Sequence, residues 1–174
     1  MLKIINNMKP FFEDCYERIS VRKYSKLIKV SPPTASKILK KYEKEGLLEE
    51  SQFERYLFFN ARRSNKDFLD LSRLYWRYQL SEILALIEKR LVTEPAVVLF
   101  GSLSKAEVKK TSDIDIAIVG TKKNATVISA AELSEFEKRL GRKIEIFEFE
   151  SLPNLAELPL FKAVLNGYIL MNTL

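Results

Sequence analysis

The sequence predicts an α/β (α+β) protein made of two parts that differ in character. Helical patterns followed by a hairpin pattern fill the N-terminal third, whereas apolar strands alternate with helical segments after Pro95. Charge divides in the same way: residues 1–63 hold 14 Lys and Arg against 8 Asp and Glu, giving +6, and residues 91–174 hold 10 against 11, giving −1. We therefore expect an N-terminal domain over 1–63, a linking helix over 64–92 and a second domain over 93–174.

Composition excludes several kinds of chemistry. The 174 residues include no histidine, so no Ser/His or Cys/His catalytic unit can form within the chain. A lone cysteine, Cys15, excludes an intrachain disulfide and cysteine-ligated zinc and favours a reducing, cytoplasmic setting. No apolar run approaches the roughly 18 residues that span a bilayer, so we expect no membrane contact. Catalysis would depend on carboxylates, Lys or Arg, hydroxyls and bound metal.

The N-terminal third contains two capped helices and a hairpin. Ser20 is placed to cap a short helix, "VRKYSKLI", and Ser31 is a strong N-cap followed by Pro32 at the first helical position. Gly46 supplies the C-terminal stop of this second helix. The segment "LLEESQFERYLFFNARR" then predicts two short strands around a polar turn.

This order of elements over about residues 10–63 resembles the winged helix-turn-helix family, with residues 31–45 in the place of the recognition helix. The resemblance implies DNA binding, with cationic side chains on phosphates and N-terminal side chains near base edges. Arg62 and Arg63 would add backbone contacts. A solvated surface helix and a protein-docking module remain alternatives. The DNA-binding candidates are Thr34, Ser36, Lys37, Lys40, Lys41, Lys44 and Arg55.

A helix without Gly or Pro is expected to join the two domains over 64–92, with a break near Leu80–Ser81. Its apolar residues recur at helical intervals. Tyr75, Trp76 and Tyr78 form an aromatic group on this helix. Such a group is more typical of a core or a dimer interface than of a base-stacking site, and we assign no site to it.

The C-terminal half predicts a sheet of three or four strands covered by helices. The strand patterns are "AVVLF", "DIDIAIV" and "KIEIFEF", and the helical ones "TVISAAELSEFEKRLG" and "LPLFKAVLN". In "DIDIAIV" the period of two puts Asp113 and Asp115 on one face. Two neighbouring carboxylates repel, and a divalent cation such as Mg²⁺ would offset this. The Gly101-Ser102 turn at the end of the first strand can approach an anion closely.

The stretch "GSLSKAEVKKTSDIDIAIV" resembles the signature of the DNA polymerase β-type nucleotidyltransferases, in particular the minimal ones: Gly-Ser, ten residues, then Asp-x-Asp. The resemblance covers roughly residues 80–174. It implies that Asp113, Asp115 and Glu145 hold Mg²⁺ or Mn²⁺ and carry catalysis. Nucleotide-binding residues would be Gly101, Ser102, Lys105 and Ser112.

Two residues depart from the family pattern. Ala106 stands where many minimal nucleotidyltransferases have Gly, which would alter the loop. The third carboxylate is Glu145 rather than the commoner Asp, and Glu148 is a rival for the same role. A working site, an inactive remnant and a simple exposed strand start are therefore all open.

The function that the resemblance implies is transfer of a nucleoside monophosphate from a nucleoside triphosphate to a hydroxyl. The short C-terminal domain favours a macromolecular acceptor or a second subunit, hence a homodimer, that completes the site. The acceptor would be nucleic acid or a partner protein, such as the toxin of a toxin–antitoxin pair. The alternative function is a DNA-binding regulator whose nucleotidyltransferase fold is inactive and serves as nucleotide sensor or assembly module.

Overall fold

The computed structural model describes residues 3–91, 94–121, 127–151 and 159–172, which form two compact units. Unit 1 is Met1–Tyr75 together with Ala106–Lys110, and unit 2 is Trp76–Lys105 together with Thr111–Leu174. Both mix helices and strands, so the chain is α+β. No described helix is both long and apolar enough to cross a membrane. Thr126 and Leu158, with which two predicted helical segments begin, lie outside the described residues.

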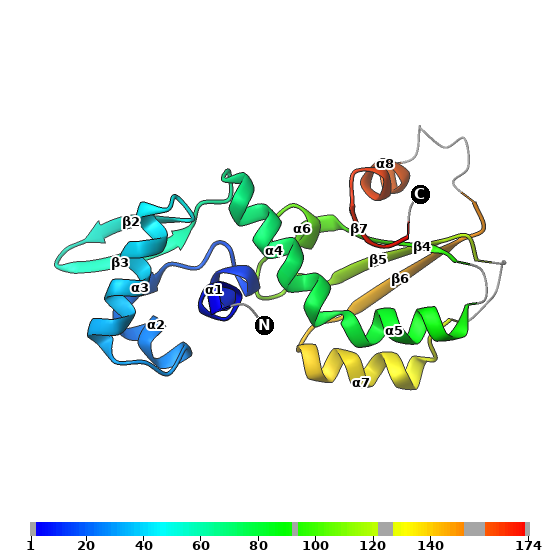
Figure 1. The fold of residues 1–174 in the computed structure, drawn as a ribbon, viewed down its shortest axis with the longest axis horizontal. Helices are drawn as coiled ribbons and strands as arrows, with labels where there is room; N and C mark the ends of the chain where they lie inside the picture. The colour runs from blue at the N-terminus through cyan, green and yellow to red at the C-terminus, as the bar shows by residue number, and fades with distance from the viewer. Residues whose placement is uncertain (1–2, 92–93, 122–126, 152–158, 173–174) are drawn as a thin grey trace. The chain divides into compact units, whose positions relative to one another are not determined.

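Unit 1 begins with a helix, a short strand and two further helices, followed by a hairpin (Figure 1). Its three strands form an antiparallel sheet in the order β1-β3-β2. The predicted hairpin is present, and Phe53 and Tyr56 are the last pair of its ladder. The elements are α1 (Lys3–Glu13), β1 (Ile19–Ser20), α2 (Val21–Leu27), α3 (Pro32–Lys44), β2 (Leu48–Phe53), β3 (Tyr56–Ala61) and α4 (Lys66–Gln79).

The predicted caps set the ends of α2 and α3. Ser20 Oγ accepts a hydrogen bond from the Lys23 amide, and Ser31 Oγ accepts one from the Thr34 amide. Pro32 occupies the first position of α3, where a missing N–H costs no hydrogen bond. After α3 the chain turns at Gly46, whose φ of 77° lies in the left-handed region. The sequence therefore fixes both the start and the end of α3.

Helix α4 belongs to both units, since the division falls between Tyr75 and Trp76. Phe68 and Tyr75 pack on Phe12 of α1, with ring centroids 5.3 and 5.4 Å apart. The chain does break at Leu80, and a separate helix α5 (Ser81–Arg90) follows. Of the aromatic group, Tyr75 and Trp76 are buried, whereas Tyr78 is exposed. Tyr75 and Trp76 therefore belong to the core, and Tyr78 does not.

Unit 2 is built on a four-stranded mixed sheet in the order β6-β5-β4-β7. Strand β4 is antiparallel to both β5 and β7, and β5 is parallel to β6. Every residue of β4 is buried, as expected for an interior strand with both faces covered. The remaining elements are β4 (Ala96–Phe100), α6 (Gly101–Ser104), β5 (Ile114–Val119), α7 (Ala130–Leu140), β6 (Ile144–Phe149), α8 (Pro159–Leu165) and β7 (Tyr168–Met171).

Helices cover both faces of this sheet (Figure 1). On one face, Val98, Phe100 and Ala117 form an apolar cluster with Val164 of α8. On the other face α5 and α7 lie side by side, and an ion pair joins Arg139 of α7 to Glu82 of α5. The face under α8 is the one on which the sequence places Asp113 and Asp115, because Asp115 and Ala117 are two residues apart on one strand.

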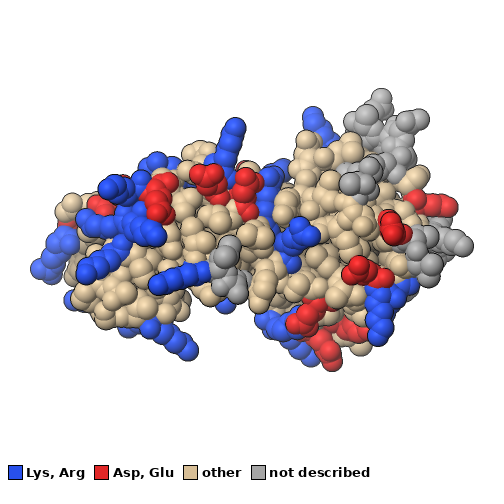
Figure 2. Space-filling model, viewed as in Figure 1, with Lys and Arg blue, Asp and Glu red and all other residues tan. Residues whose placement is uncertain are grey.

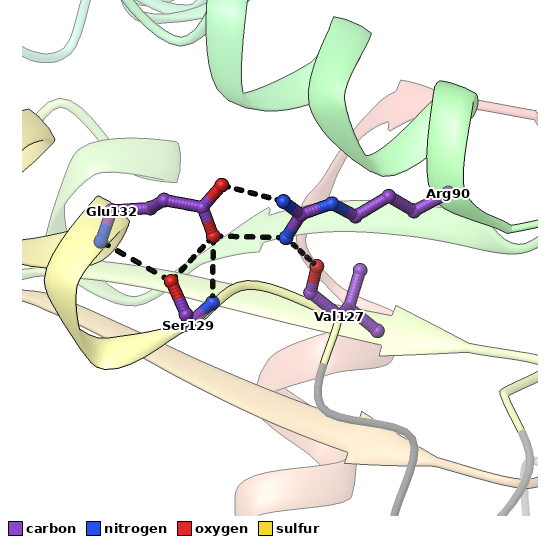
Figure 3. A network of polar contacts seen from close by, with 4 residues as sticks. All are labelled: Arg90, Val127, Ser129 and Glu132. Atoms are coloured by element: carbon purple, nitrogen blue, oxygen red, sulfur yellow. Dashed lines mark hydrogen bonds and ion pairs between the residues drawn. The ribbon is translucent and has the colours of Figure 1, made fainter.

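A polar network ties the end of α5 to the start of α7 (Figure 3). The Arg90 guanidinium donates two hydrogen bonds to the Glu132 carboxylate, at 2.9 and 2.5 Å, and one to the Val127 carbonyl. Ser129 and Glu132 form a capping box at the first turn of α7. The hydrogen bonds from Arg90 and then those from Ser129 lower the pKa of Glu132 from 4.5 to about 2.

Because Glu132 has a lower pKa in the folded protein, its ionised form stabilises the fold above about pH 4.5, and this contribution is lost as the pH falls toward 2. We expect Glu132→Gln to lower the melting temperature at pH 6–7, with the difference from wild type shrinking below pH 4. Thermal unfolding followed by circular dichroism from pH 7 to 2.5 measures this. Glu135→Gln, at an exposed position of the same helix, is the matched control. Equal effects of the two variants at every pH would contradict the prediction.

Candidate active site

The candidate site is built around the end of β4 and the start of β5. Phe100, the last residue of β4, is the ladder partner of Asp115, and Gly101 follows it at a φ of 68°. A Cβ on Gly101 would lie 2.1 Å from Asp115 Oδ2. Only glycine therefore lets the turn and the carboxylate approach this closely. The ten residues between Ser102 and Asp113 bring the two halves of the motif back to one point.

The third predicted carboxylate lies on the neighbouring strand at the same level. Asp115 of β5 and Glu145 of β6 are partners in the parallel ladder, so their side chains share a face of the sheet. Glu148 is an odd number of residues from Glu145 and points to the opposite face. Its Oε1 accepts a hydrogen bond from the Val127 amide, 3.3 Å away. Of the two rivals, Glu145 is the one beside Asp115.

Asp115 lies close enough to the other two carboxylates for their charges to affect it. The pKa of Asp115 is raised, first by burial and then by the negative charges of Glu145 and Asp113. Asp115 is half-buried, whereas Asp113 and Glu145 are exposed. As the side chains stand, no three acidic or thiol groups in the described part of the chain lie close enough to hold a metal ion. The arrangement is a carboxylate cluster whose negative charge disfavours ionisation of its most buried member.

The predicted nucleotide-binding residues lie on both sides of the connecting loop. Gly101 and Ser102 open the four-residue helix α6, and the Lys105 amide closes it by donating to the Ser102 carbonyl at 3.3 Å. Lys105 is exposed. Ser112 lies at the other end of the loop, next to Asp113. Ser104, which no sequence pattern marked, donates from its hydroxyl to the Gly101 carbonyl at 3.0 Å and so helps to fix the turn.

Arg142 is a positioning residue that the sequence analysis missed. Its guanidinium donates to the Ser112 carbonyl at 2.6 Å and lies over the Trp76 ring, 5.2 Å from the centroid. It thereby holds the backbone that enters Asp113. The signal available in the sequence was the basic pair Arg142 and Lys143 directly before the strand pattern "IEIFEF".

The match to a protein family decides what kind of domain this is. The family model described as "Polymerase beta, Nucleotidyltransferase" matches residues 82–172, just over half of the chain. The chain belongs to this family. No curated protein and no solved structure matches the chain. The nucleotidyltransferase domain thus includes α5, the four strands of the mixed sheet and the carboxylate cluster.

The residues predicted to bind DNA lie on α3 and at the hairpin turn of unit 1. All are exposed except Ser36, which is half-buried. Figure 2 shows Lys and Arg side chains over this part of the chain, interspersed with acidic ones. Two of the lysines are ion-paired, Lys40 with Glu50 at 3.8 Å and Lys41 with Glu45 at 3.7 Å. Exposed pairs of this kind are weak, so the lysines can exchange them for other anions.

The close approach of Gly101 to Asp115 predicts a difference between two glycine substitutions. Gly101→Ala and Gly141→Ala both place a side chain at a left-handed φ, 68° and 65°, which costs roughly 1–2 kcal/mol of folding free energy. Gly141 has open space around its Cα, but at Gly101 the new methyl must displace the Asp115 carboxylate. We expect both variants to be destabilised by about that amount and only Gly101→Ala to lose binding of a Mg²⁺–nucleoside triphosphate.

Urea unfolding gives the free energies and isothermal titration calorimetry gives the binding constants for this pair. Unimpaired nucleotide binding in Gly101→Ala would show that the Asp115 carboxylate is not needed where the structure has it.

Proposed function

We propose that this chain transfers a nucleoside monophosphate from a nucleoside triphosphate to a hydroxyl of a macromolecular acceptor, with Mg²⁺ or Mn²⁺ as cofactor. The observation that carries the proposal is the contact of the Gly101 backbone with Asp115, at the level where Asp115 is paired with Glu145. The turn proposed to bind the phosphates and the carboxylate cluster thereby lie together where β4 ends and β5 begins. Membership of the nucleotidyltransferase family supports a nucleoside triphosphate as substrate.

The donor set fits a hard divalent cation. Asp113, Asp115 and Glu145 offer only oxygen ligands, which Mg²⁺ and Mn²⁺ prefer. Burial first, and then the negative charges of Glu145 and Asp113, raise the pKa of Asp115, and a cation would offset the part that comes from those charges. Asp113 and Glu145 are exposed, which leaves room for their carboxylates to turn toward Asp115. When bound, the cation would neutralise phosphate charge and polarise the phosphorus–oxygen bonds that react.

The protein's own groups would bind the phosphates and activate the acceptor hydroxyl. The backbone amides of Gly101 and Ser102, with the Ser102 hydroxyl and the Lys105 ammonium, would hold the β- and γ-phosphates. Glu145 would accept hydrogen bonding from the acceptor hydroxyl and help to remove its proton. The acceptor oxygen then bonds to the α-phosphorus while the bond from that phosphorus to the pyrophosphate oxygen breaks. Pyrophosphate leaves, and the proton passes to Glu145 and then to solvent.

The acceptor is proposed to be a macromolecule. Partner proteins and nucleic acid are the two candidate classes, and a second copy of the chain could complete the site. The fold of unit 1 supports nucleic acid as the acceptor class. Its order of helix, strand, two helices and hairpin, with sheet order β1-β3-β2, supports the proposal that it is a winged helix. We propose that α3 enters a DNA groove and that Arg55 contacts the backbone.

The transfer reaction predicts metal-dependent labelling. Purified protein with Mg²⁺ and α-³²P-labelled ATP, CTP, GTP or UTP should label itself, a co-purified partner or added nucleic acid. Asp113→Ala/Asp115→Ala should reduce labelling by at least about a hundredfold, since ligands to the metal supply several kcal/mol of transition-state stabilisation. Glu148→Ala, on the opposite face of β6, is the matched control and should retain activity.

Labelling that persists in the double variant would refute the assigned site. Mg²⁺-dependent nucleotide binding without any transfer would instead favour the alternative, a DNA-binding regulator with a nucleotide-sensing domain. Ala106, which replaces the Gly common in this loop, is the observation that favours this second candidate.

Binding through α3 predicts that DNA affinity falls steeply with salt. Lys37→Glu/Lys41→Glu reverses two charges one helical turn apart and should weaken duplex binding at least about tenfold at 100 mM salt, with a smaller slope of log affinity against log salt. Fluorescence anisotropy with a labelled random duplex measures both. Lys66→Glu/Lys89→Glu makes the same charge change at exposed positions of α4 and α5 and is the control. Equal weakening by both pairs would argue against a groove contact by α3.

A further inference from the structure

The loop that joins the two halves of the nucleotide site belongs to unit 1. Ala106–Lys110 clusters with the N-terminal residues, although Lys105 before it and Thr111 after it belong to unit 2. Within this loop Ala106 and Val108 are fully buried. Ala106 has a φ of 53°, a left-handed conformation that is unfavourable for a residue other than glycine. A buried, strained loop of this kind is held by its surroundings.

The surroundings are the segment Asp14–Tyr16 after α1. The Cys15 amide donates to the Val108 carbonyl at 2.8 Å, and the Lys110 amide donates to Asp14 Oδ2 at 3.3 Å. Asp14 Oδ1 also accepts from the Tyr16 amide at 3.0 Å, which orients the carboxylate. The Lys109 ammonium lies 5.4 Å from the centroid of the Tyr16 ring. Two hydrogen bonds therefore hold the loop: a backbone bond from Cys15 to Val108, and a bond from the Lys110 amide to the side chain of Asp14.

Tyr16 is itself anchored within unit 1. Arg63, just after the hairpin, donates from Nη1 to Tyr16 Oη at 2.8 Å, and its guanidinium lies 4.1 Å from the ring centroid. The hairpin, the Asp14–Tyr16 segment and the loop are thus connected by consecutive contacts inside one compact unit. A change in the hairpin or α1 region can reach the loop along this chain of contacts.

From the loop, the covalent chain leads directly into the nucleotide site. Ser102 lies four residues before Ala106, and Asp113 lies three residues after Lys110. Peptide geometry limits the reach of three or four residues to about 10–14 Å, so the loop's position limits where the turn and the carboxylate can lie. We infer that Asp14–Tyr16 positions the nucleotide-binding turn, so that nucleotide binding and the state of the N-terminal unit are coupled. This inference rests on the proposed nucleotidyltransferase function.

Coupling between binding events is reciprocal, which makes the inference testable from both sides. Saturating Mg²⁺ with ATP, CTP, GTP or UTP, each tried separately on the full chain, should slow amide hydrogen exchange at residues 101–105, within the site. It should also slow exchange at residues 14–16, which lie far from the site in sequence. Peptides from α2, residues 21–27, should remain unchanged.

The second measurement is the dissociation constant of the nucleotide that binds, from titration calorimetry. Asp14→Ala removes the acceptor for the Lys110 amide and should raise this constant about three- to tenfold, the range typical of residues that act on a site from outside it. Asp14→Asn keeps an acceptor oxygen and should restore most of the affinity. Asp70→Ala makes the same change at an exposed position of unit 1 that pairs with Arg73 instead, and should leave the constant unchanged.

The outcomes separate this inference from the proposed function. Protection confined to residues 101–105, with unchanged affinity in Asp14→Ala, would overturn the inference and leave the proposed function intact. If wild type binds none of the four nucleotides, the proposed function fails and the inference falls with it. Should Asp14→Ala not fold, the exchange pattern of wild type decides, because unprotected residues 14–16 would refute the inference.

Discussion

The contact between the Gly101 backbone and the Asp115 carboxylate is the constraint on which the rest of the C-terminal unit depends. It requires a glycine at a left-handed φ directly after a buried strand, and it requires that strand to pair with β5 in the observed register. The period of two along β5 then decides which residues face α8 and which face α5 and α7. A shift of one residue in this pairing would turn the carboxylates to the other face and the isoleucines toward the site.

The site combines features that oppose folding. A half-buried carboxylate lies beside two others, and burial together with their charges raises the pKa of Asp115. On the same face, Phe100, the ladder partner of Asp115, packs against Phe147 with ring centroids 5.4 Å apart. Such clusters are typical of functional sites, where stability is given up for a group that must bind charge. The sheet tolerates it because β4 is covered on both faces.

Much of the fold could be predicted from the sequence because its signals are local. Ser31 with Pro32 sets the start of α3, Gly46 and Gly141 follow helix ends, and alternation in "DIDIAIV" gives the face of Asp115. The spacing between Gly101-Ser102 and Asp113 was enough to indicate the domain that the family match supports. The register of Glu145 with Asp115 needed the parallel pairing, which no local pattern specifies. The role of Arg142 and the anchoring of Ala106–Lys110 by Asp14 depend on contacts between residues far apart in the chain. Such contacts produce no periodic pattern in the sequence, so they could not be predicted from it.

The membership of Ala106–Lys110 in unit 1 bears on how the protein is made. The N-terminal unit is discontinuous: its first seventy-five residues emerge from the ribosome well before Val108, whose carbonyl the Cys15 amide requires and whose side chain is buried. Until then, that amide and the surface beneath Val108 remain open. Folding of the first unit is therefore completed only when synthesis has passed the Gly101–Ser102 turn, and a gene fragment that ends at Tyr75 would lack the loop to which the Cys15 amide is hydrogen-bonded.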